Sequence, residues 1–185
     1  MAGARGFVAV VGARVLPGSV APQVAAVVRD FLARGWGIGS GGARGADAFA
    51  LRALVAVGPA ACARSVVFLP GAVPARAAML HAFVARGGRV VPGAGLGRLA
   101  LLGRSRRLAQ ASAGVVAFLW GPSRGSVFTV REAIRAGKPA AVVLAGGGAA
   151  LPAFFGGRWV PCRLKNLCEN GPPASSMNRD EKGAP

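Results

Sequence analysis

The chain has 185 residues, of which 53% are hydrophobic, and its 23 Lys and Arg against 6 Asp and Glu give a net charge of +17. This length and hydrophobic content are typical of one globular domain and exclude wholesale disorder, and the 29 Gly and 13 Pro follow no Gly-X-Y period, which excludes collagen. The charge favours anionic partners such as nucleic acid, nucleotides or an acidic membrane surface, although an Arg-rich coding bias explains its origin equally well.

Short apolar runs alternate with amphipathic stretches along the chain. The apolar runs predict buried strands at 7–11, 36–40, 65–69, 89–91, 115–120 and 140–144. The stretches between them have apolar residues at helical spacing and predict helices at 20–34, 46–57, 74–86, 98–113 and 127–136. Because the strands lack polar alternation and are joined by helices, we expect an α/β fold, a doubly wound and mainly parallel sheet of the extended Rossmann-like type with helices on both faces.

The sheet is expected to form a single domain over residues 1–150. Residues 151–170 are expected to form a small extension that buries Phe154, Phe155 and Trp159, and the polar residues 171–185 a disordered tail. The one uncharged stretch of membrane length, residues 139–157, contains two Pro and five Gly, so we expect no membrane-spanning helix.

The cysteines bear on metal binding and on location. Cys62, Cys162 and Cys168 form no Cys-x-x-Cys pair, and the single histidine, His81, is far from them in the sequence. We therefore expect no zinc site, and the sequence indicates no other metal or cofactor. Reduced thiols and the lack of a convincing secretory signal favour a cytoplasmic protein.

Ligands of open parallel sheets bind beyond the carboxyl ends of the strands, and a Gly-rich segment there is suited to anions. Residues 39–47 follow the second predicted strand; glycines let the backbone approach a phosphate, and the next helix offers free N–H groups. Asp47 is interpreted as a helix cap or as a partner of a ligand hydroxyl. A tight turn without a ligand is the alternative, since the GxGxxG frame in this Gly-rich chain is weak evidence. The candidate ligands here are Ser40, Gly41, Gly42, Arg44, Gly45 and Asp47.

Two further segments and one isolated arginine complete the candidate site. Residues 103–107 are placed at the start of a basic helix, where Arg104 and Arg107 share one face and Arg106 points elsewhere. Residues 121–129 lead into the next helix, and a solvated face and a plain N-cap are the alternatives for these two segments. The candidate phosphate ligands are Arg104, Arg106 and Arg107 in the first segment, Arg124, Gly125, Ser126 and Thr129 in the second, and Arg14 after the first strand.

These motifs resemble a known family. Ser40-Gly-Gly-Ala-Arg-Gly-Ala-Asp47, Arg104-Ser-Arg106 and Gly125-Ser-Val-Phe-Thr129 are similar, in this order, to motifs of the DNA-processing protein A (Smf) family and its relatives in the SLOG superfamily. The resemblance covers about residues 7–144. It implies a Rossmann-like fold, binding of single-stranded DNA in a basic pocket, and help in loading a recombinase during transformation. The chain departs from the pattern at Ser105, where the family usually has Asn, and at Ala113, where it usually has Asp.

A second branch of the superfamily, the cytokinin-activating phosphoribohydrolases, suggests an enzyme instead. Thr129-Val-Arg-Glu132 keeps the Thr-x-x-Glu spacing of that branch, and Arg104 or Arg106 would supply its catalytic arginine. The Pro-Gly-Gly-x-Gly part of the motif is absent. We therefore favour a non-enzymatic module that binds single-stranded DNA or a nucleotide. The alternatives are a nucleotide-binding or nucleotide-cleaving enzyme using Glu132 and Arg106, and a structural domain whose pocket is unused.

Glu132 has a plain structural interpretation as well. It is expected one turn into its helix, where it compensates the helix dipole or pairs with Arg131 or Arg135. The resemblance further implies a recombinase partner and a homodimer, for which the strand at 140–144 or the helix at 127–136 is available.

Overall fold

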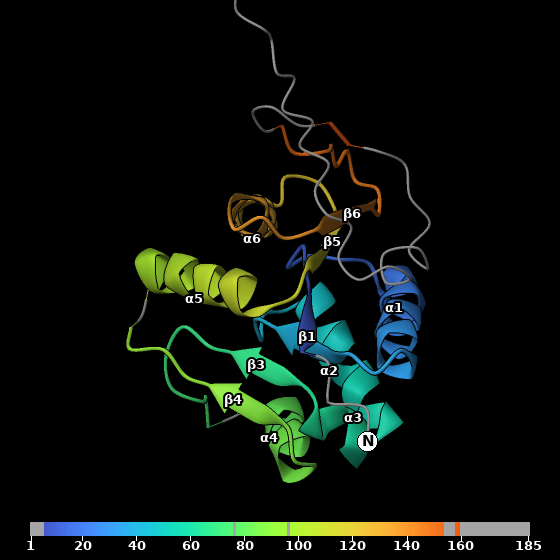
Figure 1. The fold of residues 1–185 in the computed structure, drawn as a ribbon, viewed down its shortest axis with the longest axis vertical. Helices are drawn as coiled ribbons and strands as arrows, with labels where there is room; N and C mark the ends of the chain where they lie inside the picture. Colours follow the sequence, from blue (N-terminus) through green and yellow to red (C-terminus); the bar gives the residue numbers. More distant parts are fainter. Residues whose placement is uncertain (1–5, 76, 96, 154–157, 160–185) are drawn as a thin grey trace, which may run out of the picture.

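The computed structural model describes residues 6–75, 77–95, 97–153 and 158–159. Its centre is a six-stranded sheet in which every pair of neighbouring strands is parallel (Figure 1). The spatial order is β4-β3-β2-β1-β5-β6. The strands are β1 (Phe7–Gly12), β2 (Gly37–Ser40), β3 (Val66–Phe68), β4 (Arg89–Val91), β5 (Val115–Leu119) and β6 (Ala140–Leu144).

Helices cover both faces of the sheet, which confirms the doubly wound α/β fold expected from the sequence (Figure 1). A short 3-10 helix, η1 (Gly18–Val20), precedes α1. The helices of one face are α1 (Ala21–Ala33), α2 (Ala46–Val57), α3 (Pro59–Ala63) and α4 (Ala78–Ala85). Those of the other face are α5 (Gly97–Ala111) and α6 (Arg124–Arg135).

The strands are apolar on both sides because each side packs against helices. In β1, Val8 and Val10 belong to the core under α1 and α2, whereas Ala9 and Val11 belong to the core under α5 and α6. This alternation sends successive side chains into two separate cores, so a continuous apolar run is what a doubly covered parallel strand requires.

One helix was not predicted, and two others begin four and three residues away from their predicted starts. α3 was not predicted; Pro59 occupies its first turn, where a missing N–H costs nothing. α4 begins at Ala78 and not at residue 74, and ahead of it Ala77 N donates to Pro74 O (3.2 Å). α6 begins at Arg124, three residues before its predicted start.

The strand order places a topological switch between β1 and β5. From β1 the chain proceeds through β2 and β3 to β4 on one side, and it then crosses back to β5 and β6 on the other. The loops after β1 and β5 therefore diverge, and in open α/β sheets ligands bind at this point, outside the carboxyl ends of the strands.

Beyond β6 the structure describes only part of the expected extension. Trp159 is half-buried, packs against the core of the α5 and α6 face, and donates from Nε1 to Pro152 O (2.8 Å). Phe154, Phe155 and the predicted tail lie outside the described residues. None of the helices in the described part of the chain is long and apolar enough to cross a membrane.

Candidate phosphate-binding site at the carboxyl edge

The loops after β1 and β2 interlock through glycines. Ala46, the first residue of α2, donates its backbone N–H to Ala13 O (3.3 Å). Gly45 has φ +70°, and a Cβ at this position would overlap Ala13 O. A Cβ at Gly12 would overlap Phe118 O and come within 2.6 Å of the Ala46 Cβ. The two loops thus form one close-packed unit at the switch point, and this unit requires glycine where the sequence has it.

A buried ion pair lies beside this unit. Arg104 of α5 extends to the β2–α2 loop, where its Nη1 is 3.6 Å from Asp47 Oδ2. Ala43 N donates to the same carboxylate oxygen (3.1 Å). The Arg104 guanidinium occupies the space that a side chain at Gly41 would fill. Asp47 therefore fixes the loop and an arginine, and it does not cap α2, which begins after Gly45.

The pair is incompletely bonded. Asp47 Oδ1 and Arg104 Nε are buried and have no hydrogen-bond partner within the described residues. Burial raises the pKa of Asp47 to about 6, against the opposing effects of the Arg104 charge, the Ala43 hydrogen bond and the Arg14 charge. Burial also lowers the pKa of Arg104, opposed by Asp47 and assisted by the like charge of Arg14. Three charged groups from three different segments therefore act on one another at this edge.

The exposed donors of the site are Arg14 and Arg44. Both side chains face solvent, and no hydrogen bond or ion pair within the described part of the chain involves either of them. Gly42 is exposed beside Arg44, with φ +66°, and its N–H donates to the buried Ser40 Oγ (3.3 Å). The Gly-rich loop thus presents backbone and a free arginine to solvent, and Ser40 acts as an internal brace.

Three of the four arginines of α5, namely Arg104, Arg106 and Arg107, contact three different parts of the chain. Arg107 donates from Nη2 to Leu69 O (2.9 Å) and from Nη1 to Pro92 O (3.0 Å), so it fastens the loops after β3 and β4. Arg106 turns away from Arg104 and Arg107 toward α6, as predicted. The segment is not at the helix start, however, because α5 begins at Gly97, and its arginines do not share the free N–H groups of a helix N-terminus.

The third predicted segment, residues 121–129, enters α6 earlier than expected, and its Ser126 and Thr129 do not cap the helix. Since α6 begins at Arg124, Ser126 and Thr129 lie inside the helix, and both are buried. Thr129 Oγ1 donates to Gly125 O (3.0 Å), and Ser123 at the N-cap position donates to Trp120 O (3.1 Å) without bonding a helix N–H. Arg124 and Gly125 are exposed at the helix start and remain available to a ligand.

Glu132 lies between α5 and α6, eight residues after the helix start and not one turn in. Its Oε2 accepts from Arg106 Nε (2.8 Å) and its Oε1 from Arg135 Nη1 (2.7 Å). The hydrogen bond from Arg106 is the main cause that lowers the pKa of Glu132. The predicted pairing with Arg135 is therefore present, whereas Arg131 donates to Ala153 O instead (3.1 Å). The helix dipole acts only over the first turn and does not explain this residue.

Sequence reasoning missed two contributions to the site. The Ala43 N–H fixes Asp47, and Gly12 permits the close contact with α2. The signal for Gly12 was present, since a glycine directly after a β-branched strand often marks a close approach of backbone. The described residues contain no group of three or more His, Cys, Asp or Glu side chains suited to a metal ion.

Solved structures share this fold. DNA processing protein A of Helicobacter pylori, in a structure of its single-stranded DNA binding mode, is 21% identical with a TM-score of 0.61 over 74% of this chain and 64% of that chain. The same protein of Streptococcus pneumoniae is 24% identical with a TM-score of 0.60 over 74% of this chain and 50% of that chain. The molybdenum cofactor carrier protein of Chlamydomonas reinhardtii is 20% identical with a TM-score of 0.54, covering 77% and 78%. A comparison with curated protein sequences gives no match.

An all-parallel sheet that is covered by helices on both faces and has a Gly-rich loop after β2, beside its switch point, defines a Rossmann-like domain. The model of one family, DNA recombination-mediator protein A, matches residues 2–146. The chain belongs to this family, as its three motifs indicated. It spans 64% and 50% of the length of the two DNA processing proteins that it resembles.

Proposed function

We propose that this chain binds single-stranded DNA, or a nucleotide as its minimal ligand, at the carboxyl edge of the sheet. The observation that carries the proposal is that two exposed arginines without a hydrogen-bond partner in the described residues, Arg14 and Arg44, lie in the Gly-rich loops after β1 and β2, beside the switch point. Guanidinium and backbone N–H groups are the donors that phosphate oxygens accept best. Family membership and the described DNA binding of the Helicobacter pylori protein support polymeric DNA as the ligand.

The candidate residues divide by role in this proposal. Phosphate contacts come from Arg14, Arg44, Arg124 and Gly125, which are exposed. Gly42 is exposed as well and lets a phosphate approach the loop closely, while its own N–H remains bonded to Ser40 Oγ. The shape and electrostatic field of the site come from Ser40, Gly41, Gly45, Asp47, Arg104 and Arg107, which are bonded or packed internally. Ser126 and Thr129 are buried in α6, where Thr129 Oγ1 donates to Gly125 O, so neither is assigned a phosphate contact.

Catalysis forms no part of the proposal. A phosphoribohydrolase would need the Glu132 carboxylate in the phosphate loop, but both of its oxygens accept from arginines between α5 and α6. The recombinase partner, the role in DNA recombination or transformation and the cytoplasmic location remain proposals that rest on the family. A homodimer and the division into a domain at 1–150, an extension and a tail are proposals of the same kind.

The test is a binding assay across a salt series with single-stranded DNA, duplex DNA and nucleoside monophosphates. A footprint of about four to six phosphates gives a slope of log affinity on log salt of roughly −3 to −4 for a single strand. Arg44→Ala is expected to weaken binding by roughly 1.5–3 kcal/mol, or about ten- to a hundredfold, since one charged hydrogen bond is lost. Its thermal unfolding should be unchanged, because Arg44 has no partner in the described residues.

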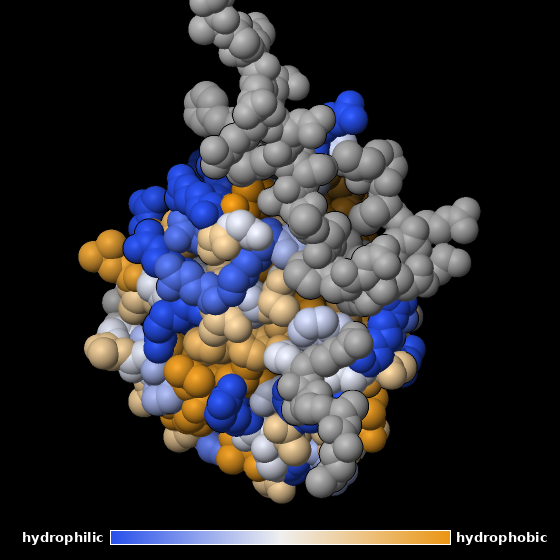
Figure 2. Space-filling model, in the orientation of Figure 1, coloured by the Kyte–Doolittle hydropathy of each residue, from blue (hydrophilic) through white to orange (hydrophobic). Residues whose placement is uncertain are grey.

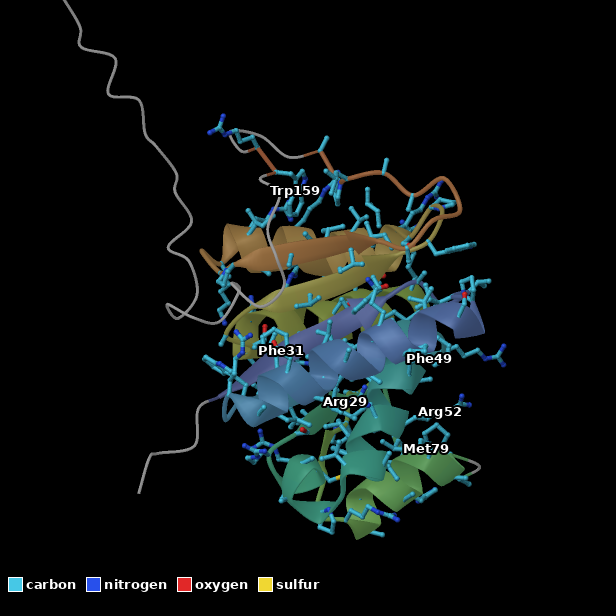
Figure 3. All side chains as sticks on the ribbon, turned by 90° about the vertical axis from the view of Figure 1, so that its right-hand side faces the viewer. Arg29, Phe31, Phe49, Arg52, Met79 and Trp159 are labelled. Atoms are coloured by element: carbon cyan, nitrogen blue, oxygen red, sulfur yellow. The ribbon has the colours of Figure 1, made fainter. Side chains whose placement is uncertain are left out.

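Arg52→Ala is the matched control, because Arg52 is an exposed arginine of α2 that is not among the candidate residues of the site (Figure 3). Equal effects of the two variants, or a salt response that is flat for every ligand, would contradict the proposed site.

A further inference from the structure

Three arginines form a basic surface on the face of the molecule formed by α5 and α6. Arg131 and Arg135 are four residues apart on α6, so they lie on one side of the helix, and Arg106 of α5 stands beside them through the shared partner Glu132. All three are exposed, and hydrophilic side chains gather over α5 and α6 in the space-filling view (Figure 2). We call Arg106, Arg131 and Arg135 the α5–α6 arginine surface.

This surface is preorganised by a single carboxylate. The side chain of Glu132 is only 8% exposed, whereas those of Arg106 and Arg135 are 56% and 70% exposed. Glu132 accepts one hydrogen bond from each of these arginines, so their other N–H groups have no partner within the described residues. The Arg106 guanidinium also lies 6.0 Å over the ring of Phe128. Two guanidinium groups are thus held side by side, with donors left over and pointing outward.

The surface is separate from the carboxyl-edge site. Arg104 and Arg106 are two residues apart, about 200° around the helix, and they bond to carboxylates on opposite sides of α5. Arg124, at the start of α6, lies on the same side of the helix as Arg131 and Arg135, seven and eleven residues before them. Arg124 therefore lies between the carboxyl edge and the α5–α6 arginine surface, and the rise along α6 from Arg124 to Arg135 is about 16 Å.

The charge and exposure of the surface favour one kind of partner over a second copy of the chain or a membrane. A second copy of the same surface would bring like charges together, which disfavours a two-fold dimer here. A membrane-surface helix needs an exposed apolar face, but the apolar residues Val130 and Ala133 of α6 are buried against the sheet. Oriented guanidinium groups with free N–H donors match the oxygens of phosphodiesters.

We propose that the α5–α6 arginine surface is a second binding site for the phosphodiester backbone of a nucleic acid, so that a long strand follows α6 from the carboxyl edge. The strand neutralises Arg131, Arg135 and Arg106 in addition to the arginines of the first site. The inference rests on the proposed function only for the continuity of the strand, since the surface itself contains none of the residues of the carboxyl-edge site.

The test uses the full chain and two lengths of single-stranded DNA: about five nucleotides, enough for the first site only, and about 25, enough for both. The variant Arg131→Gln with Arg135→Gln should reduce the steepness of the salt dependence for the long strand by about 1.4, since about 0.7 is lost per phosphate contact. Near physiological salt this change corresponds to about a tenfold loss of affinity. Binding of the short strand should be unchanged.

The matched control is Arg29→Gln with Arg52→Gln, which removes the same charge from the opposite, α1 and α2 face (Figure 3). Arg131→Gln alone leaves both ion pairs of Glu132 intact and should give about half the change in slope, should the double variant fail to fold. An equal effect of the control pair, an equal loss for short and long strands, or tighter binding to anionic vesicles than to DNA would each overturn the inference.

The experiments can contradict the carboxyl-edge site and the α5–α6 arginine surface independently of each other. Arg44→Ala should weaken both strand lengths if the carboxyl-edge site binds DNA. If Arg44→Ala has no effect while Arg131→Gln with Arg135→Gln weakens the long strand, the carboxyl-edge site is wrong and the α5–α6 arginine surface stands.

Discussion

Helix α5 carries two arginine–carboxylate contacts of opposite character. On one side Arg104 meets Asp47, where both side chains are at least nine-tenths buried, the charged atoms are 3.6 Å apart and one polar atom of each side chain has no partner in the described structure. On the other side Arg106 meets Glu132, with a bond of 2.8 Å and a second arginine at 2.7 Å. Burial raises the pKa of Asp47 to about 6, whereas hydrogen bonds lower the pKa of Glu132.

The difference shows that an opposite charge nearby is not by itself enough to keep a buried carboxylate ionised. Asp47 is surrounded by protein and receives too few hydrogen bonds to offset the loss of water. Glu132 is buried as well, but each of its oxygens accepts from a guanidinium that remains in contact with solvent. The carboxyl edge therefore contains a charge that changes near pH 6, and the α5–α6 surface contains one that stays ionised at neutral pH.

The largest difference between the two contacts is expected when the arginine is removed from each, measured as the loss of unfolding free energy. Arg104→Met leaves Asp47 buried without its cation, and we expect the free energy of unfolding at neutral pH to fall by about 3–5 kcal/mol. Arg106→Met should cost less than about 1 kcal/mol, because Arg106 is half-exposed and Glu132 keeps Arg135. Urea unfolding measures both, and equal losses would contradict the greater dependence of the buried Asp47 carboxylate on its arginine.

The pH dependence of stability should have opposite signs at the two carboxylates. Between about pH 4 and pH 6 the folded chain holds a proton on Asp47 that the unfolded chain has lost, so this group stabilises the fold at low pH, and its contribution is lost as the pH rises through about 6. The change amounts to about 3 kcal/mol for a shift of about two pKa units. The difference in unfolding free energy between the wild type and Asp47→Asn isolates it, and a difference that does not vary with pH would contradict it.

Glu132→Gln should act more mildly. The amide keeps one oxygen that can accept from one arginine, whereas its NH2 group faces the N–H donors of the other, so one of the two hydrogen bonds is lost together with the charge. Because both arginines are more than half exposed, we expect a loss of about 1–2 kcal/mol at neutral pH. The pKa of Glu132 is lowered in the fold, so its stabilisation is present above the unfolded value and is lost as the pH falls through the folded one. Unfolding at neutral and acidic pH measures this loss.

The same variant tests the enzymatic alternative. We expect no release of base from nucleoside monophosphates by the wild-type chain. Release that disappears in Glu132→Gln would favour an enzyme over a binding module.

Thr129→Val should have the smallest effect. Its hydroxyl donates to Gly125 O within the helix, so the variant removes one local hydrogen bond and should cost less than about 1 kcal/mol. DNA affinity should be unchanged, because Thr129 is buried. A clear loss of affinity without a loss of stability would return Thr129 to the phosphate-binding residues.

The strands and the family were predictable from the sequence because both depend on local patterns. The apolar run 7–11 predicts a buried strand, and the motif at 40–47 indicates the family, without knowledge of any distant residue. The partners of the charged residues were not predictable in the same way. Arg104 is far from Asp47 in the sequence, and Arg106 is 26 residues from Glu132, so these contacts exist only once α5 has packed against the sheet and α6.

The start of α6 was missed for a related reason. Ser126 and Thr129 are good N-cap residues, so the sequence favoured a later start. The helix instead begins at Arg124, after Ser123 has used its hydroxyl on Trp120 O, and the buried positions of Ser126 and Thr129 decide their roles. At this helix start the burial of Ser126 and Thr129 therefore outweighs their propensity for the N-cap position, and the ends of helices are the parts least certain to predict.

Arg107 links the folding of distant parts of the chain. β3 and β4 are three residues each. The loops that follow them are joined to each other by backbone hydrogen bonds, such as Gly95 N to Pro70 O (3.2 Å), and they are joined to α5 by the two hydrogen bonds of the Arg107 side chain. The Arg107 bonds form only when α5 is docked, so the outer edge of the sheet and the helix on its other face should open and close as one cooperative unit. A fluctuation that lifts α5 then removes its hold on the loops after β3 and β4 and, through Arg104, its contact with the Gly-rich loop.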